Sequence, residues 1–429
     1  MVESNLEISQ ELKNLAKTIE SSQDNFFIAG KAGTGKSTLI KHIRETSKKN
    51  LVVLAPTGVA AVNVDGQTIH SFCGLPFSFI NKEAIHEHRD KNLYRNLDLL
   101  IVDEISMVRA DVFDGMDHFF RINRFDKTLP FGGLQVILVG DLYQLSPVVE
   151  TSLRSAFSMQ YKTPYFFSSS AFSQNRDSFR LIELQKIYRQ DDERFIDILH
   201  EARHSRLSRE SLDLINERVI SEDEPDESFI ILTSRNDMAN KINQKRLSEI
   251  EAEEKTYEAE LTGQFEEKSY PTEFELKLKP GAKVMFLKND YHGRWVNGSL
   301  GYVSEAEDDF VTVDLEGAVF ELKKEVWQKI KYVFNDKTKR IEEEVIGTFT
   351  QYPLRLAWAV TIHKSQGMTF DKVVIDLGQG AFSHGQTYVA LSRCRTLDGI
   401  YLKRPIRQAD FIFDKDVVGF YSIFEDKVH

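Results

Sequence analysis

The stretch Asn25–Leu39, NFFIAGKAGTGKSTL, decides the fold of this chain. It opens with an apolar run, Phe26 to Ala29, which predicts a buried strand. A glycine-rich turn follows, and a helix is expected to begin at Lys36. The turn matches the pattern G-x-x-x-x-G-K-[ST], in which backbone N–H groups wrap a triphosphate and the helix N-terminus faces its negative charge. The stretch therefore predicts a nucleoside triphosphate site built on a strand, a turn and a helix.

The same pattern assigns individual roles within the turn. Lys36 is expected to reach the β- and γ-phosphates, and Ser37 is expected to hold Mg²⁺. The other residues predicted to bind the nucleotide here are Gly33, Thr34, Gly35 and Thr38. ATP and Mg²⁺ are the expected cofactors.

Composition describes an ordinary water-soluble protein of two to four domains, with 429 residues of which 41% are hydrophobic and 28% charged. No apolar run approaches the ~20 residues that span a membrane, and the polar start is not a signal peptide. Only two cysteines occur, Cys73 and Cys394, which favours an intracellular setting, cytoplasmic for a bacterial protein. The net charge of −11 argues weakly against nucleic acid, but a local basic groove is compatible with it.

Short apolar strands that end in polar residues follow the opening stretch. They are expected at Leu51–Ala55, Leu99–Val102 and Val136–Val139. Apolar strands that alternate with helices predict an α/β fold with a parallel sheet, whose ligands lie at the carboxyl ends of the strands. The chemistry is therefore expected along one edge of this sheet.

Asp103 and Glu104 stand at one of those strand ends. Asp103 is expected to hold Mg²⁺ and Glu104 to polarise the attacking water, although a solvated acidic pair is the simpler interpretation. Gln144 follows the next strand and is placed to sense the γ-phosphate; its plain alternative is a turn residue before Pro147.

The second half of the chain predicts another parallel sheet, interrupted by an insert. A strand near Leu181 opens a second strand–helix system, and apolar strands recur at 229–236, 356–362, 372–376 and 399–402. Between Lys279 and Val345, strands of five to seven residues with Gly, Asn and Asp turns predict a small antiparallel barrel.

The ordered motifs of the chain resemble the petite-integration-frequency (Pif) family of superfamily-one 5′-to-3′ DNA helicases, with RecD-type helicases as relatives. The motifs are GKAGTGKST, APTGVAAVNVDGQTIHSF, IVDEISMV, VGDLYQLSPV, LQKIYRQDDERFIDILHEAR, NGSLGYV, TIHKSQGMTF and YVALSRCRT. The resemblance covers nearly the whole chain. It implies two RecA-like domains, at 1–62 with 81–178 and at 179–253 with 348–429, a wedge insert at 63–80 and an SH3-like barrel at 254–347.

The resemblance also implies roles around the nucleotide. Gln10 would contact adenine, or would belong to a helix packed on the first sheet. Gln144 would couple the γ-phosphate to DNA, and Gly367 would lie at the nucleotide. Arg189 and Arg393 would enter from the second domain as arginine fingers, and helix capping or surface ion pairing is their alternative.

A DNA path is implied as well. The residues that the resemblance places on the single-strand track are Thr57, Gly58, His70, Thr361, His363 and Lys364, although satisfied loop structure explains any one of them. Leu75, Pro76 and Phe77 would form the wedge that splits the duplex, or a hydrophobic loop packed on the first sheet. Whether Tyr291, Trp295 or Phe310 of the barrel stacks on bases or fills its core stays open.

One motif competes with this reading. His200-Glu201-Ala202-Arg203-His204 matches H-E-x-x-H, the pattern of a zinc peptidase helix, within a stretch that resembles the Pif signature.

The sequence thus predicts a monomeric ATP-dependent 5′-to-3′ DNA translocase and helicase that acts on single-stranded DNA and single-strand/duplex junctions. G-quadruplex DNA and DNA–RNA hybrids remain open as substrates. The alternatives are an ATP-dependent nucleic-acid binding switch that does not unwind, and an RNA translocase.

Overall fold

The computed structural model describes residues 8–186, 192–204, 206–220, 229–412 and 414–425. Its first sheet is parallel, with strand order β3-β2-β4-β5-β1-β6. The strands are β1 (Asn25–Gly30), β2 (Leu51–Ala55), β3 (Gln67–Thr68), β4 (Leu99–Val102), β5 (Gln135–Gly140) and β6 (Phe179–Leu184). The predicted parallel sheet is confirmed, and all its carboxyl ends lie on one edge.

Side-chain alternation along β1 gives this sheet two covered faces. Phe26 and Ile28 point toward α1 (Gln10–Ser21) and α2 (Lys36–Thr46), whose buried residues include Leu12 and Leu39. Phe27 points the other way, into an aromatic core beneath α6 (Ala110–Asn123) and α8 (Ser170–Ser173). A strand buried on both faces is expected to be apolar, as β1 is after its first residue, Asn25.

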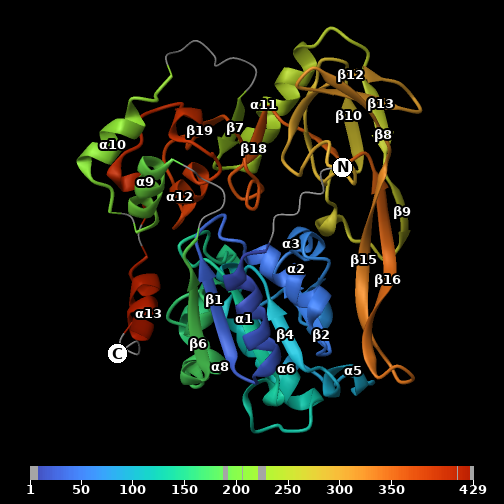
Figure 1. The fold of residues 1–429 in the computed structure, drawn as a ribbon, viewed down its shortest axis with the longest axis vertical. Helices are drawn as coiled ribbons and strands as arrows, with labels where there is room; N and C mark the ends of the chain where they lie inside the picture. Colours follow the sequence, from blue (N-terminus) through green and yellow to red (C-terminus); the bar gives the residue numbers. More distant parts are fainter. Residues whose placement is uncertain (1–7, 187–191, 205, 221–228, 413, 426–429) are drawn as a thin grey trace.

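The second sheet is also parallel, with strand order β18-β7-β19-β20. Its strands are β7 (Ile230–Thr233), β18 (Ala359–Thr361), β19 (Val373–Asp376) and β20 (Ile400–Leu402). Helices α9 (Glu193–Arg203), α10 (Arg209–Asn216), α11 (Asn236–Glu249) and α12 (Gln386–Leu391) accompany it above the first domain (Figure 1). The predicted α/β fold with two parallel sheets is confirmed.

An antiparallel insert separates β7 from β18, as predicted. Five strands pair in the order β14-β13-β12-β11-β17, and β8 (Lys255–Glu258) pairs with β10 (Glu275–Leu278). The five strands are β11 (Lys283–Phe286), β12 (Leu300–Ala306), β13 (Val311–Leu315), β14 (Ala318–Leu322) and β17 (Leu354–Leu356). Both groups of strands enclose one hydrophobic core, and Trp295 belongs to it. Tyr291, by contrast, is almost fully exposed.

A long hairpin leaves this insert and runs down beside the first domain (Figure 1). It consists of β15 (Glu325–Asn335) and β16 (Arg340–Gln351), with β9 (Glu260–Gly263) pairing at its upper end. Tyr332 enters the aromatic core of the first domain, and its hydroxyl accepts a hydrogen bond from the N–H of Val53 at 3.2 Å. Arg44 and Glu343 form an ion pair of 2.6 Å nearby.

Two segments cross the predicted domain boundaries. The strand expected to open the second domain is β6, which instead pairs in parallel with β1 and completes the first sheet. The strands of the insert continue past the predicted end at residue 347, because β16 ends at Gln351 and β17 pairs with β11. Both errors come from strand pairing, which short apolar runs do not specify.

The last helix, α13 (Lys415–Glu425), also returns to the first domain, although 348–429 was predicted to be second-domain chain. Phe420 is 3% exposed and packs against Phe27, Phe166, Phe167 and Phe172, with ring centroids 4.7–5.9 Å apart. Helix α13 therefore packs on the first domain and adds aromatic side chains to its core.

Cys73 and Cys394 are both buried, and neither takes part in a disulfide. Within the described ranges, no helix is both long enough and apolar enough to cross a membrane.

We expect Phe420→Ala to lower the free energy of unfolding by about 3–5 kcal/mol, because it removes a ring from a close-packed aromatic core. Chemical denaturation followed by circular dichroism measures this loss. Phe382 is 61% exposed, so Phe382→Ala serves as the control and should change stability by less than about 0.5 kcal/mol. Equal effects of the two variants would show that α13 is not part of the core.

Candidate nucleotide-binding site and DNA-contacting surface

The predicted phosphate loop joins β1, which ends at Gly30, to α2, which begins at Lys36. Gly33 and Gly35 have φ angles of 81° and 87°, in the left-handed region that glycine adopts without strain. The Thr34 hydroxyl donates to the carbonyl of Lys31 at 3.0 Å and braces the turn from within. The loop thus has the strand–turn–helix context that the motif requires.

The Lys36 ammonium lies at the floor of this loop. It donates to the carbonyls of Gly30 at 2.7 Å and Lys31 at 3.0 Å. Burial lowers the pKa of Lys36, and the carboxylates of Asp141 and Glu104 act against that shift. The ammonium is therefore a half-buried cation with several carboxylates around it.

The two acids after β4 occupy different positions. Asp103 is buried, and Glu104 faces the nucleotide cavity with a backbone φ of 49°, which is strained for a residue other than glycine. Burial raises the pKa of Asp103 to about 7, with the neighbouring Glu104 carboxylate adding to the shift. Burial also raises the pKa of Glu104, while the Lys36 and Arg393 cations oppose that shift. A carboxyl poised in this way suits proton transfer.

A cavity of about 570 Å³ unites most of the predicted nucleotide residues. Those that line it are Gly33, Thr34, Gly35, Lys36, Ser37, Thr38, Glu104, Gln144, Gly367 and Arg393. Its volume matches that of a cofactor site. Because Gly367 and Arg393 belong to the second domain, the cavity lies between the two domains.

Arg393 is 1% exposed and held in place by its own domain. Its guanidinium donates to the carbonyls of Val389 at 3.0 Å and of Ser365 and Met368 at 3.3 Å. Arg189, the other predicted finger, lies outside the described residues.

Gln10 does not line the cavity. Its exposed side chain donates to the Asn14 side chain at 2.8 Å, and the neighbouring Ile8 and Ser9 line the cavity instead. Thr369 and Arg395 also line it and were not predicted, although Thr369 lies within the TIHKSQGMTF motif.

The predicted wedge divides into a buried base and an exposed tip. Leu75 was predicted to belong to the wedge, but it is 5% exposed and packs in the first domain's core. Phe77 is 70% exposed, and its ring stacks on His70 at 4.8 Å. Pro76 lies between them and is half-buried. Only Phe77 projects as a wedge would.

The residues predicted to lie on the DNA track differ in their exposure and in their contacts within the protein. Thr57 is exposed and caps α3 (Gly58–Asn63), because its hydroxyl accepts from the N–H of Ala60 at 3.2 Å. Gly58 packs against Ser269 of the insert, which leaves no space for a Cβ. Burial lowers the pKa of His70.

In the second domain, Thr361 is buried and its hydroxyl accepts from the N–H of Lys364 at 3.3 Å. This hydrogen bond agrees with satisfied loop structure, the alternative to DNA contact for Thr361. Lys364 is exposed beside a second cavity of about 340 Å³, which Arg355 and Gln244 also line. Burial lowers the pKa of His363.

The H-E-x-x-H stretch does not have the geometry of a zinc site. The two imidazole rings lie 4.5 Å apart, but the Glu201 carboxylate accepts hydrogen bonds from the N–H and hydroxyl of Ser208, at 2.8 and 3.0 Å. Among the residues described, no three His, Cys, Asp or Glu side chains gather as metal ligands.

Two parallel-sheet domains that share one phosphate-loop cavity define a two-domain P-loop motor ATPase. A family model described as PIF1-like helicase matches residues 7–212. The ATP-dependent DNA helicase Pif1 of Bdellovibrio bacteriovorus is 35% identical over 98% of this chain and 93% of that protein. The chain belongs to the PIF1-like helicase family.

Solved structures of Pif1 helicases are also similar to this chain. Bacteroides sp Pif1 in complex with ADP-AlF4 is 37% identical, with a TM-score of 0.89 over 98% of this chain and 97% of that chain. Bacteroides Pif1 bound to ssDNA has the same identity and coverage, but a TM-score of 0.70. The chain spans about 60% of the length of the human and Emericella nidulans relatives that it matches.

We expect Asp103→Asn to stabilise the ligand-free protein more near pH 8 than near pH 5. The pKa of Asp103 is raised from its ordinary value of 3.8 to about 7 in the folded protein. Ionising this carboxyl therefore destabilises the fold, and the loss of stability grows as the pH rises from about 3.8 to about 7. Asparagine carries no charge and avoids this cost. Calorimetric melting temperatures at both pH values measure the difference, and a stabilisation independent of pH would contradict the assignment.

Proposed function

We propose that this chain hydrolyses ATP with Mg²⁺ to move 5′ to 3′ on single-stranded DNA and to separate the strands of a duplex. The observation that carries the proposal is the shared cavity, in which Lys36 and Glu104 of the first domain face Arg393 of the second. A site assembled from both domains allows the state of the nucleotide to set the distance between them.

The residues present suit ATP and Mg²⁺. Mg²⁺ keeps several waters and takes few protein ligands besides phosphates, so the Ser37 hydroxyl and the Asp103 carboxylate suffice. Lys36 and the loop N–H groups would hold the β- and γ-phosphates. Bound Mg²⁺ would neutralise phosphate charge. Its positive charge would also favour the ionised form of Asp103, whose pKa is raised in the absence of a metal.

Hydrolysis would then use the groups around the γ-phosphate. Glu104 would accept the proton of the attacking water, and Gln144 would sense the γ-phosphate. Arg393 would neutralise charge in the transition state, an effect worth ~10³–10⁵ in rate for arginine fingers. Gln10 and Arg189 stay predictions for the adenine and for a second finger.

The likeness to Bacteroides Pif1 supports DNA as the track. The domain arrangement is closer to the ADP-AlF4 complex than to the ssDNA complex, with TM-scores of 0.89 and 0.70 at equal identity. We infer that single-stranded DNA rearranges the domains of this chain as it enters. Thr57, His363 and Lys364 would contact its phosphates, and junctions would meet Phe77.

A strand-separation assay tests the proposal, with duplexes that carry either a 5′ or a 3′ single-stranded tail. We expect ATP-dependent separation of the 5′-tailed duplex alone. Lys36→Ala should abolish ATP turnover and strand separation, because the ammonium would hold the phosphates of ATP. DNA binding should persist, because Lys36 is not among the residues predicted to contact DNA. A requirement for the 3′ tail would refute the polarity. DNA-stimulated turnover without separation would identify a binding switch, and equal activity on an RNA strand would identify an RNA translocase.

We expect Phe77→Ala to reduce duplex separation and to leave ATP turnover on single-stranded DNA unchanged, because its ring is exposed and distant from the core. Leu75→Ala is the contrasting variant. It should lower both activities together through a stability loss of about 2–5 kcal/mol, since Leu75 is buried. Parallel losses in both assays for Phe77→Ala would show that the tip is structural.

A further inference from the structure

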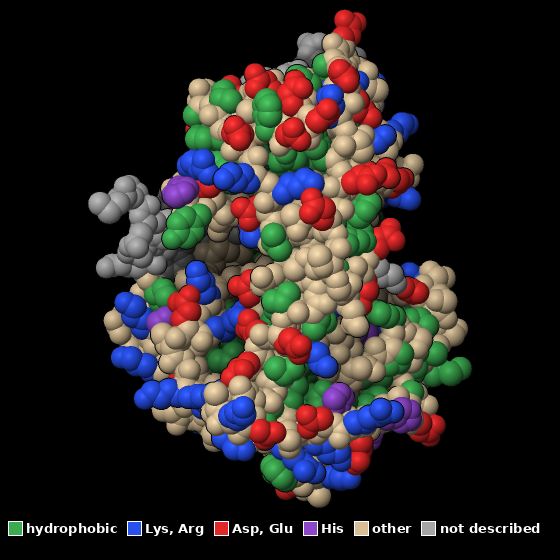
Figure 2. Space-filling view, turned by 90° about the vertical axis from the view of Figure 1, so that its right-hand side faces the viewer, with side chains coloured by type: hydrophobic (Ala, Val, Ile, Leu, Met, Phe, Trp, Pro, Cys, Tyr) green, Lys and Arg blue, Asp and Glu red, His purple; other side chains and the backbone are tan. Residues whose placement is uncertain are grey.

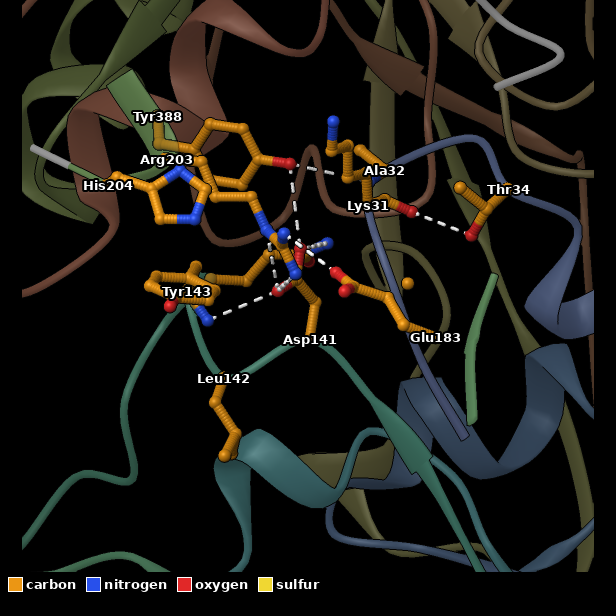
Figure 3. Close-up of polar contacts among 12 residues, drawn as sticks. Lys31, Ala32, Thr34, Asp141, Leu142, Tyr143, Glu183, Arg203, His204 and Tyr388 are labelled. Carbon is orange, nitrogen blue, oxygen red and sulfur yellow. Dashed lines mark hydrogen bonds and ion pairs between the residues drawn. The ribbon is translucent and has the colours of Figure 1, made fainter. Parts of the chain in front are cut away.

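Arg203, at the end of α9, makes a buried contact with the first domain. The α9 helix itself packs in the second domain's core through Phe195 and Ile198. The guanidinium of Arg203 lies 3.2 Å from the Asp141 carboxylate and 2.9 Å from that of Glu183, and its side chain is 3% exposed (Figure 3). Asp141 follows β5 and Glu183 lies in β6, so the ion pairs join the second domain to the first sheet.

Asp141 in turn holds the loop that carries Gln144. Its carboxylate accepts hydrogen bonds from the N–H of Tyr143 at 3.2 Å and from the side-chain amide of Gln144 at 3.4 Å. The Arg203 guanidinium also lies 4.4 Å from the centre of the Tyr143 ring. The carboxylate of Asp141 is therefore shared between Arg203 and Gln144, which lines the nucleotide cavity.

The same carboxylate reaches the phosphate loop. Tyr388 of α12 donates its hydroxyl to Asp141 at 3.5 Å and accepts the N–H of Ala32 at 3.4 Å (Figure 3). Burial, followed by the Asp141 carboxylate, raises the pKa of Tyr388, so the hydroxyl keeps the proton that it donates. One buried carboxylate thus connects α9, α12, the Gln144 loop and the phosphate loop.

The second domain closes on this loop from another side. Gly385, at the start of α12, lies so close that a Cβ would come within 2.4 Å of the carbonyls of Tyr143 and Gln144. The His384 ring contacts the carbonyl of Leu142 at 3.2 Å. These contacts leave the loop little room to adjust, and the Asp141 carboxylate accepts a hydrogen bond from the Gln144 amide within it.

We propose that Arg203 is a positioning residue for ATP hydrolysis: its pair with Asp141 orients Gln144 only when the second domain is docked. The inference rests on the proposed function and adds a residue that does not touch the nucleotide. Arg203 lies outside the nucleotide cavity and acts through Asp141. Domain docking and the geometry around the γ-phosphate are thereby linked by one ion pair.

Arg203→Gln tests the proposal, with Arg404→Gln as the matched control. Arg404 also pairs with a buried carboxylate, Asp410, at 2.9 Å, but both partners belong to the second domain. Arg203→Gln is expected to lower kcat for DNA-stimulated ATP hydrolysis on the order of 10²-fold, the effect of a displaced catalytic group, with little change in KM. Arg404→Gln should leave both constants near the wild-type values.

A double variant separates positioning from folding. Arg203→Gln leaves the Asp141 carboxylate buried without its cation, and adding Asp141→Asn removes that charge. We expect the double variant to recover the melting temperature and to stay as slow as Arg203→Gln. Recovery of kcat together with the melting temperature would overturn the proposal.

Binding of ADP-AlF4, a mimic of the transition state, gives a readout that needs no turnover. Arg203→Gln should weaken binding of ADP-AlF4 and leave binding of ADP alone unchanged, since only the former needs Gln144 in place. Equal weakening of both nucleotides, or none, would refute the positioning role. A wild-type protein that neither hydrolyses ATP nor prefers ADP-AlF4 over ADP would refute the proposed function, and Arg203 with it.

Discussion

The Lys36 ammonium is the charge around which the molecule is arranged. It lies at the carboxyl edge of the first sheet, where Asp103, Glu104 and Asp141 converge because their strands are parallel neighbours. Three carboxylates and one ammonium in a buried site leave an excess of negative charge. Burial is the main cause of the raised pKa values of Asp103 and Glu104, and a neighbouring carboxylate adds to each shift.

The cations that relieve it come from the second domain. Arg393 faces Glu104 across the cavity, and Arg203 pairs with Asp141 behind it. Side chains from both domains therefore contribute charge to this site. A nucleotide with its metal would change the balance, which gives ATP a direct means of altering how the domains meet.

Contacts of different chemistry join the rest of the chain to the first domain. The α13 helix contributes buried aromatic rings, the β15–β16 hairpin combines Tyr332 with the Arg44–Glu343 ion pair, and Arg203 pairs with two carboxylates, Asp141 and Glu183. Figure 2 shows Asp and Glu side chains at the upper end of the molecule, and others intermingled with Lys and Arg over its middle and lower parts. The net charge of −11 is thus spread over a surface that also carries local groups of basic side chains.

The sequence by itself determined the local chemistry. The phosphate loop, the acids after β4, the two parallel sheets and the antiparallel insert follow from patterns within single stretches, because glycine turns and apolar runs are constrained by neighbours in the chain. Only the tertiary structure decided which strands pair and which side chains meet. It placed β6 and α13 in the first domain and Leu75 in its core, and it brought Arg203 to Asp141 across 62 positions. An arginine at a helix end carries no local sign of its partner, since an ion pair between distant segments depends on the packing of everything between them.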